Sequence, residues 1–229
     1  MLDLNIISNY IDKQQVAYVA FSGGIDSVAL LYACSVLKKD GRLNELKAIH
    51  VNHNLSINAK LWEDHCINIC KKLDIELIIH NIFIETNKDG LESAARKGRY
   101  DVFNKVVKHN EQLLLGHHAD DVAETILFRL FRGTGIDGLQ GPKPKRKIGE
   151  GTLIRPLLKF SKKELLDFIT TNKIDYIEDE SNKESNQDRN YIRNKIMPLI
   201  HERWQNSEKR IQLTSELIQE KLEIFNSLF

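Results

Sequence analysis

Short apolar runs alternate with amphipathic stretches along the first two-thirds of the chain. Because these runs are apolar throughout rather than alternating with polar residues, they are typical of strands that are buried on both faces. We predict such strands at Val16–Phe21, Leu46–Val51, Ile75–Ile84, Leu113–Gly116 and Leu153–Leu158. Helices are predicted between them, at Ser27–Lys38, Asn58–Leu73, Gly90–His109 and Ala119–Phe131. This order predicts an α/β fold, in which helices cover both faces of an open parallel sheet.

The last third has a different pattern and predicts a helical C-terminal portion. Residues 133–151 are rich in glycine and carry a basic run, which predicts a long loop. Ser161 and Glu164 form the pattern of a capping box at the start of a helix that reaches about Asn172. The polar stretch 178–190 predicts a loop, 190–204 a helix broken near Pro198, and 207–229 a closing amphipathic helix. We therefore predict two units, a catalytic domain at 1–160 and a helical extension at 161–229.

Composition and charge narrow the class of protein. The 229 residues are 41% hydrophobic and 28% charged, and the net charge of +1 gives no global signal for nucleic acid. No run of eighteen apolar residues and no secretory leader pattern occur, so we expect no membrane partner and a cytoplasmic location. The three cysteines, Cys34, Cys66 and Cys70, follow helical spacing and are interpreted as core residues rather than metal ligands.

A compact motif, Ser22-Gly23-Gly24-Ile25-Asp26-Ser27, lies between a predicted strand and a predicted helix. Glycines allow close approach of the backbone to an anion, and the free N–H groups of a helix start favour phosphate. The motif matches neither the lysine-bearing GxxxxGK(S/T) loop nor the GxGxxG dinucleotide loop. Asp26 would repel phosphate unless Mg²⁺ lay between them, so the motif favours a magnesium-nucleotide complex over a plain Gly-Gly turn.

A second cluster, Gly116-His117-His118-Ala119-Asp120-Asp121 with Glu124 and Thr125, opens the helix after the fourth predicted strand. The carboxyl ends of parallel strands share one edge of a sheet, so this cluster is expected beside the first motif, with His50 and His53 facing the same crevice. Asp121 and Glu124 share a helical face, where they would hold Mg²⁺ or a cationic substrate. Helix capping by the aspartates and a metal-hydrolase site are the open alternatives.

Basic residues are scattered through the sequence, and each one alone is most simply a solvated surface charge. Arg189 and Arg193 lie four residues apart and are expected to share a helix face. Together the basic positions would meet RNA phosphates or ATP. They are Arg96, Arg99, Arg129, Arg132, Arg155, Arg189, Arg193 and the 143–147 run.

The motif SGGxDS resembles that of the PP-loop ATP pyrophosphatases, which split ATP into AMP and pyrophosphate. More of the chain resembles one branch, the tRNA(Ile)-lysidine synthetases, over roughly residues 16–198. The segments that carry this resemblance are FSGGIDSVALL at 21–31, HVNHNL at 50–55, ESAARKGRY at 92–100, GHHADDVAETILFRLFRGTGIDGL at 116–139, IRPLL at 154–158, and YIEDESN with DRNYIRN at 176–194.

The resemblance implies the catalytic domain of an enzyme that adenylates the wobble cytidine of a CAU-anticodon isoleucine tRNA with ATP and then attaches L-lysine. It implies catalytic roles for Asp26, Asp121 and Glu124, and Mg²⁺ at Asp26 and Asp121. ATP would contact Ser22, Gly23, Gly24, Ile25, Asp26, Ser27, His53 and His117. The tRNA or its phosphates would contact Arg96, Arg99, Arg129, Arg132, Arg189 and Arg193.

Other functions stay open at this point. One is another PP-loop enzyme, such as a tRNA thiolase or an amidating synthetase, although a thiolase would need cysteines near the site. Another is a nucleotide-binding RNA module without turnover, against which the acidic cluster argues. A homodimer is also left open.

Overall fold

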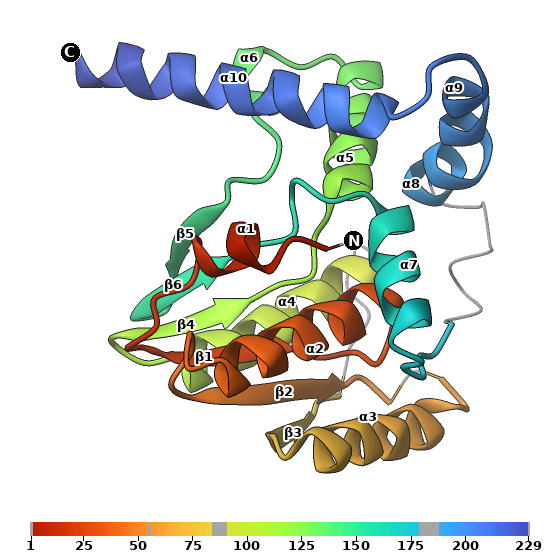
Figure 1. Ribbon diagram of the computed structural model, residues 1–229. Helices are drawn as coiled ribbons and strands as arrows, with labels where there is room; N and C mark the ends of the chain where they lie inside the picture. Colours follow the sequence, from red (N-terminus) through yellow and green to blue (C-terminus); the bar gives the residue numbers. More distant parts are fainter. Residues whose placement is uncertain (1, 55, 84–90, 179–187, 229) are drawn as a thin grey trace.

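The computed structural model describes residues 2–54, 56–83, 91–178 and 188–228. Its centre is one six-stranded sheet with the order β3-β2-β1-β4-β6-β5 (Figure 1). The strands are β1 (Val16–Ala20), β2 (Leu46–Asn52), β3 (Glu76–Asn81), β4 (Glu111–Leu114), β5 (Lys145–Ile148) and β6 (Gly151–Ile154). Five strands are parallel and β5 is antiparallel to β6, so the predicted open parallel sheet is confirmed for all but its outermost strand.

Helices cover both faces, as the apolar strands predict. On one face α1 (Leu4–Ser8), α2 (Ile25–Lys39), α3 (Ala59–Leu73) and α7 (Lys162–Thr171) enclose the larger core. On the other face α4 (Leu91–Val106) packs on the sheet through Val102 and Phe103, and Val107 directly after it joins the same core. Cys34, Cys66 and Cys70 lie in the larger core as free thiols, which confirms their interpretation as packing residues.

The helical C-terminal portion is confirmed. It contains α7, α8 (Asp188–Tyr191), the π-helix η2 (Ile192–Ile196), α9 (Met197–Arg203) and α10 (Ser207–Ser227). The Ser161–Glu164 capping box at the start of α7 is present. Phe168 of α7 packs edge-on against Tyr32 of α2, with 5.7 Å between the ring centres. Pro198 stands in the first turn of α9, where a missing N–H is tolerated. The division at residue 160 remains a prediction.

The stretch predicted as one loop at 133–151 is partly regular, which corrects that prediction. It holds α6 (Ile136–Leu139) and β5, and it follows α5 (Ala119–Phe131). Three of the four β5 residues are basic and exposed, so no apolar run marks this edge strand in the sequence. Most of the polar stretch at 178–190 lies outside the described residues. Among the helices that the structure describes, none is long and apolar enough to cross a membrane.

Candidate active site

The glycine loop, Ser22 to Ser27, connects the end of β1 to the first turn of α2. Gly23 is buried and has φ +85°, a left-handed conformation that favours glycine, and a Cβ there would meet Cys66 Sγ at 3.1 Å. Ser27 Oγ donates to the Gly24 carbonyl at 3.0 Å and accepts the Ser22 N–H at 3.2 Å, which fixes the turn. Gly24 is the N-cap of α2 and has no side chain to satisfy the free N–H groups, so they remain open to an anion.

A distant segment holds the glycine loop from the side. The Ile177 N–H donates to the Gly23 carbonyl at 2.9 Å, and Gly24 and Ile177 form a parallel bridge. Tyr176 packs against the larger core. Sequence reasoning did not place this segment at the site, because a single bridge leaves no periodic pattern.

The end of β4 touches the start of α2. A Cβ on Gly116 would lie 3.0 Å from the Asp26 carbonyl carbon and oxygen, so only glycine allows this approach without a shift. The contact brings the Gly116–Thr125 cluster beside the glycine loop, as predicted from the shared edge of the sheet.

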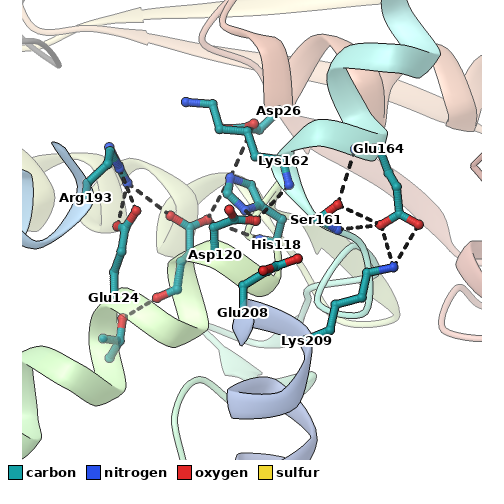
Figure 2. Close-up of polar contacts among 12 residues, drawn as sticks. Asp26, His118, Asp120, Glu124, Ser161, Lys162, Glu164, Arg193, Glu208 and Lys209 are labelled. Carbon is teal, nitrogen blue, oxygen red and sulfur yellow. Dashed lines mark hydrogen bonds and ion pairs between the residues drawn. The ribbon is translucent and has the colours of Figure 1, made fainter. Parts of the chain in front are cut away.

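His118 lies at the centre of this junction, surrounded by three carboxylates (Figure 2). Its Nε2 is 3.4 Å from Asp26 Oδ1 and 3.6 Å from Asp121 Oδ2, and its Nδ1 is 3.3 Å from Asp120 Oδ2. Burial alone would lower the pKa of the imidazole, but Asp121, Asp120 and Asp26 raise it well above 6.5. The buried His118 side chain is therefore a cation that joins both motifs, although sequence reasoning assigned a site role to His117 instead.

The two aspartates combine charge with helix capping. Asp121 Oδ2 accepts the His118 backbone N–H at 3.1 Å, and Asp120 Oδ2 accepts the Lys162 N–H at the start of α7 at 2.7 Å. The capping interpretation is thus correct for Asp121, which caps α5, whereas Asp120 accepts an N–H of another helix, α7. Through Asp120, the first turn of α7 is tied to His118.

Arg189 and Arg193 lie against α5 and neutralise its acidic face (Figure 2 shows Arg193). Arg193 binds Glu124 with two nitrogens, Nε to Oε1 at 2.6 Å and Nη2 to Oε2 at 2.7 Å, and Nη2 is 3.4 Å from Asp121 Oδ1. Arg189 Nε is 3.4 Å from Glu124 Oε2, and its Nη2 is 3.7 Å from Asp121 Oδ1. Only 3% of the Glu124 side chain is exposed, so its carboxylate is fully engaged.

The pKa of Asp121 is lowered although burial acts to raise it. The opposing causes are the charges of His118, His117 and Arg189, with the His118 backbone N–H. Asp121 is therefore an ionised carboxylate in a charge-balanced cluster. The π-helix η2, which contains Arg193, is anchored by the buried Ile192, which packs with Ala123 of α5.

The other predicted histidines have separate surroundings. His117 Nδ1 accepts a hydrogen bond from Arg155 Nε at 3.1 Å, and burial with nearby arginines lowers the pKa of His117 to about 4. His50 Nδ1 and the Phe21 carbonyl are 2.8 Å apart. Burial, Arg99 and His50 lower the pKa of His53 to about 4. His117 and His53 are thus neutral at physiological pH.

The remaining predicted arginines do not gather at His118. Arg129 Nη1 donates to the Gly138 carbonyl at 2.8 Å, and the Arg132 guanidinium lies 5.0 Å from the Phe128 ring centre. Both stand about 12 Å or more along α5 from Asp121, at a rise of about 1.5 Å per residue. Arg96 lies 5.1 Å from the Tyr100 ring centre.

Asp26 is the carboxylate that best fits Mg²⁺. Its Oδ1 is buried and makes no hydrogen bond within the described residues, while the side chain remains 39% exposed. Mg²⁺ is usually held by one or two carboxylates together with substrate phosphates, which suits a position beside the glycine loop. Asp121 already meets His118, Arg189 and Arg193. No group of three or more His, Cys, Asp or Glu side chains suited to a metal occurs in the described part of the chain.

The cysteines do not offer reactive sulfur. Cys66 Sγ lies beneath the glycine loop, but burial raises its pKa to about 12, and the pKa values of Cys34 and Cys70 are also raised to about 12. A thiol in this state is protonated at neutral pH and is a weak nucleophile.

Comparison with known proteins shows the family to which most of the chain belongs. Residues 3–200 match the PP-loop domain family. A tRNA(Ile)-lysidine synthase of Pseudomonas fluorescens is 41% identical over 186 residues, 81% of this chain and 42% of that protein. One of Pseudomonas putida is 37% identical over 211 residues, 92% of this chain and 49% of that protein. The chain thus spans about half the length of these curated relatives.

A solved structure shows the same fold. The U34-tRNA thiolase NcsA from Methanococcus maripaludis, solved with its 4Fe-4S cluster, superposes with a TM-score of 0.74 at 18% identity. The alignment covers 94% of this chain and 77% of that chain. Together with the family match over most of the sequence, these findings identify the chain as a member of the PP-loop domain family.

Proposed function

We propose that this protein forms lysidine in an isoleucine tRNA that has a CAU anticodon, using ATP and L-lysine. The observation that carries this proposal is the junction at His118, where the glycine loop meets the Asp120–Asp121 cluster. The similarity to curated tRNA(Ile)-lysidine synthases over 81–92% of the chain supports the choice of substrate.

The first step is adenylation of the cytidine oxygen. The N–H groups of the glycine loop, with the Ser22 hydroxyl, would hold the ATP phosphates, and the loop is kept in shape by Ser27 and Ile177. The O2 oxygen of the wobble cytidine attacks the α-phosphorus, and pyrophosphate leaves. The imidazolium of His118 would balance the negative charge of Asp26 and the phosphates. Mg²⁺ bound at Asp26 would supply further charge neutralisation at the phosphates.

The second step transfers lysine. The ε-amine of lysine attacks carbon 2 of the activated cytidine, and AMP leaves with the former carbonyl oxygen. Attack requires the neutral amine, so the proton of the ammonium must pass to a nearby acceptor. We assign the lysine contact to Asp121, which is ionised and has its Oδ2 3.6 Å from His118 Nε2. Because both oxygens of Glu124 bind Arg193, we assign Glu124 the role of positioning that arginine.

The alternatives receive less support. A thiolase that used its own cysteines would need an accessible thiolate, whereas these thiols are buried and protonated. A metal hydrolase would need a ligand cluster, and the described residues contain no group of three such side chains. An RNA module without turnover leaves the cluster of His118 with its carboxylates unexplained.

The test is ATP–pyrophosphate exchange with the purified protein, followed by incorporation of labelled L-lysine. The RNA is an isoleucine tRNA transcript with a CAU anticodon, and the control transcript has a CAU-anticodon methionine tRNA body. Exchange that depends on the isoleucine transcript, with lysine entering the RNA, is expected. Exchange without lysine entry would discard the substrate assignment for this chain. The absence of exchange would remove the adenylation step altogether.

A further inference from the structure

A group of cations surrounds one tyrosine at the outer edge of the sheet. The guanidinium of Arg96, one turn earlier on α4, lies 5.1 Å from the centre of the Tyr100 ring, and that of Arg146 on β5 lies at the same distance. The positive charge of the buried Arg155 also lowers the pKa of Tyr100. We call Arg96, Tyr100, Arg146 and Arg155 the Tyr100 cluster.

The antiparallel pairing of β5 explains how the cluster forms. Arg146 is opposite Leu153, which faces the core beneath α4, so the Arg146 side chain points to the α4 side of the sheet. Figure 1 shows β5 at the outer edge with α4 behind the sheet. The flanking Lys145 and Lys147 are exposed and extend the basic edge.

Arg155 joins the Tyr100 cluster to the candidate active site. It is only 5% exposed, and its Nη1 donates to the Lys143 carbonyl at 2.7 Å while its Nε donates to His117 Nδ1 at 3.1 Å. His117 precedes His118 in the chain. Arg155 therefore connects the Tyr100 cluster to the residue that precedes His118.

The guanidiniums of the Tyr100 cluster differ from those of Arg189 and Arg193 in their surroundings. Among the side chains that the structure describes, no carboxylate pairs with Arg96, Arg146 or Arg155, in contrast to Arg189 and Arg193. Burial acts to raise the pKa of Tyr100, yet the three guanidinium groups lower it. A cluster of unpaired guanidiniums attracts an anion, and phosphate suits their planar donor geometry.

The position of the cluster indicates which phosphate it meets. The glycine loop follows β1, and β5 is three places away in the sheet order, a distance of about 14 Å at the usual strand spacing. That separation favours a polymer that spans both places over a single nucleotide held at the glycine loop.

We infer that the Tyr100 cluster binds the phosphodiester backbone of the RNA substrate and so leads the target base to the His118 junction. This inference rests on the proposed function for the identity of the RNA. Arg146 and Arg96 contact phosphate, and Tyr100 is a positioning residue whose ring holds both guanidinium planes. Arg155 links the cluster to His117 through its hydrogen bond to Nδ1.

The test measures binding of the fluorescently labelled isoleucine tRNA transcript by anisotropy, without ATP or lysine, from about 50 to 200 mM salt. We expect Arg146→Ala to weaken binding roughly fivefold and to reduce the slope of log K against log salt by about 1. The Arg96→Ala/Arg146→Ala double variant should reduce this slope by about 2. Tyr100→Leu should resemble Arg146→Ala, whereas Tyr100→Phe, which keeps the ring, should bind like the wild type.

The matched control is Arg210→Ala, which removes an exposed arginine from α10. An equal loss in the control, an unchanged salt slope in the Arg146 variants, or no salt-dependent binding by the wild type would overturn the inference. Circular dichroism of each variant separates loss of binding from loss of fold.

A second measurement distinguishes RNA from nucleotide. If the KM for ATP in pyrophosphate exchange rises in Arg146→Ala while RNA binding is unchanged, the anion is ATP and the inference is wrong. The failure of the proposed function has a different signature. In that case the wild type binds RNA through the Tyr100 cluster, and the variants weaken it as expected, but no lysine enters the transcript.

Discussion

Arg189 and Arg193 pack against Asp121 and Glu124, whereas Arg96 and Arg146 lie over the Tyr100 ring. The first pair is balanced by carboxylates of α5, with Glu124 almost fully buried. The second group has no carboxylate partner among the described side chains. Arginines that look alike in the sequence therefore differ in whether their charge is available to a ligand.

The two groups of arginines differ in pairing because their surroundings differ in burial. A buried carboxylate must be paired, and the desolvated Glu124 obtains its partner from η2. At the sheet edge the guanidiniums of the exposed Arg96 and Arg146 use the face of an aromatic ring, which requires no opposite charge. The first region is thus expected to stabilise the fold and order the site, and the second to bind an anion.

Removal of Glu124 is expected to have the largest effect. Glu124→Ala leaves Arg193 with Asp121 as its remaining ion-pair partner, and breaking a buried pair in this way costs about 3 kcal/mol. Urea unfolding of the variant and the wild type measures the difference. The Glu124→Ala/Arg193→Ala double variant should recover part of the loss, since it also removes the guanidinium that has lost its two hydrogen bonds to Glu124.

The matched control for Glu124→Ala is the partly exposed pair of Lys159 and Glu216, in which Nζ and Oε1 are 2.9 Å apart. Glu216→Ala should cost less than about 1 kcal/mol. If both variants lose similar stability, the pairing of Arg193 with Glu124 does not distinguish this region.

Asp121→Asn is expected to act on catalysis more than on RNA binding. We expect about a hundredfold slower lysine incorporation, because the neutral amide no longer attracts and orients the lysine ammonium group. Affinity for the tRNA transcript should change less than twofold, since Asp121 is not one of the residues to which we assign a phosphate contact. Single-turnover lysine transfer and anisotropy measure the two quantities on one preparation. Full lysidine formation by the variant would remove Asp121 from the mechanism.

The neighbouring histidines should give opposite pH dependence. The pKa of His118 is raised, so its stabilisation is present below pH 6.5 and is lost as pH rises through the raised value. The pKa of His117 is lowered to about 4, so the unfolded state takes up a proton first and stability falls as pH decreases from 6.5 toward 4. The free energy of unfolding, followed between about pH 4 and pH 9, tests both signs.

Variants separate the two histidines. His118→Gln should flatten the alkaline loss of stability, and His117→Gln should flatten the acid loss. Equal pH profiles in both variants and the wild type would show that neither histidine differs in protonation between the folded and unfolded states.

The sequence predicted the sheet well because its parallel strands are apolar on both faces. β5 escaped prediction because Lys145, Arg146 and Lys147 show no apolar pattern, and an edge strand is defined by its partner rather than by its own residues. β4 begins two residues before its predicted start, since Glu111 and Gln112 pair with β1 despite their polarity.

The sequence predicted where the site lies, but not which of its side chains contact one another. Motif spacing placed Asp26 and Asp121 at one edge, but it could not tell that His118 rather than His117 lies between them. Adjacent residues at a helix start point in different directions, and only the fold decides which one turns inward. The pairing of Arg193 with Glu124 was equally hidden, because 69 residues separate them.

The smallest expected effect completes the comparison of the two arginine regions. Arg146→Ala removes an exposed side chain that has no carboxylate partner among the described residues, so the free energy of unfolding should change by less than about 0.5 kcal/mol. Urea unfolding beside Glu124→Ala measures it under one set of conditions. A loss comparable to that of Glu124→Ala would mean that the Tyr100 cluster holds β5 against α4. In that case weaker RNA binding by the same variant would reflect a displaced strand rather than a lost phosphate contact.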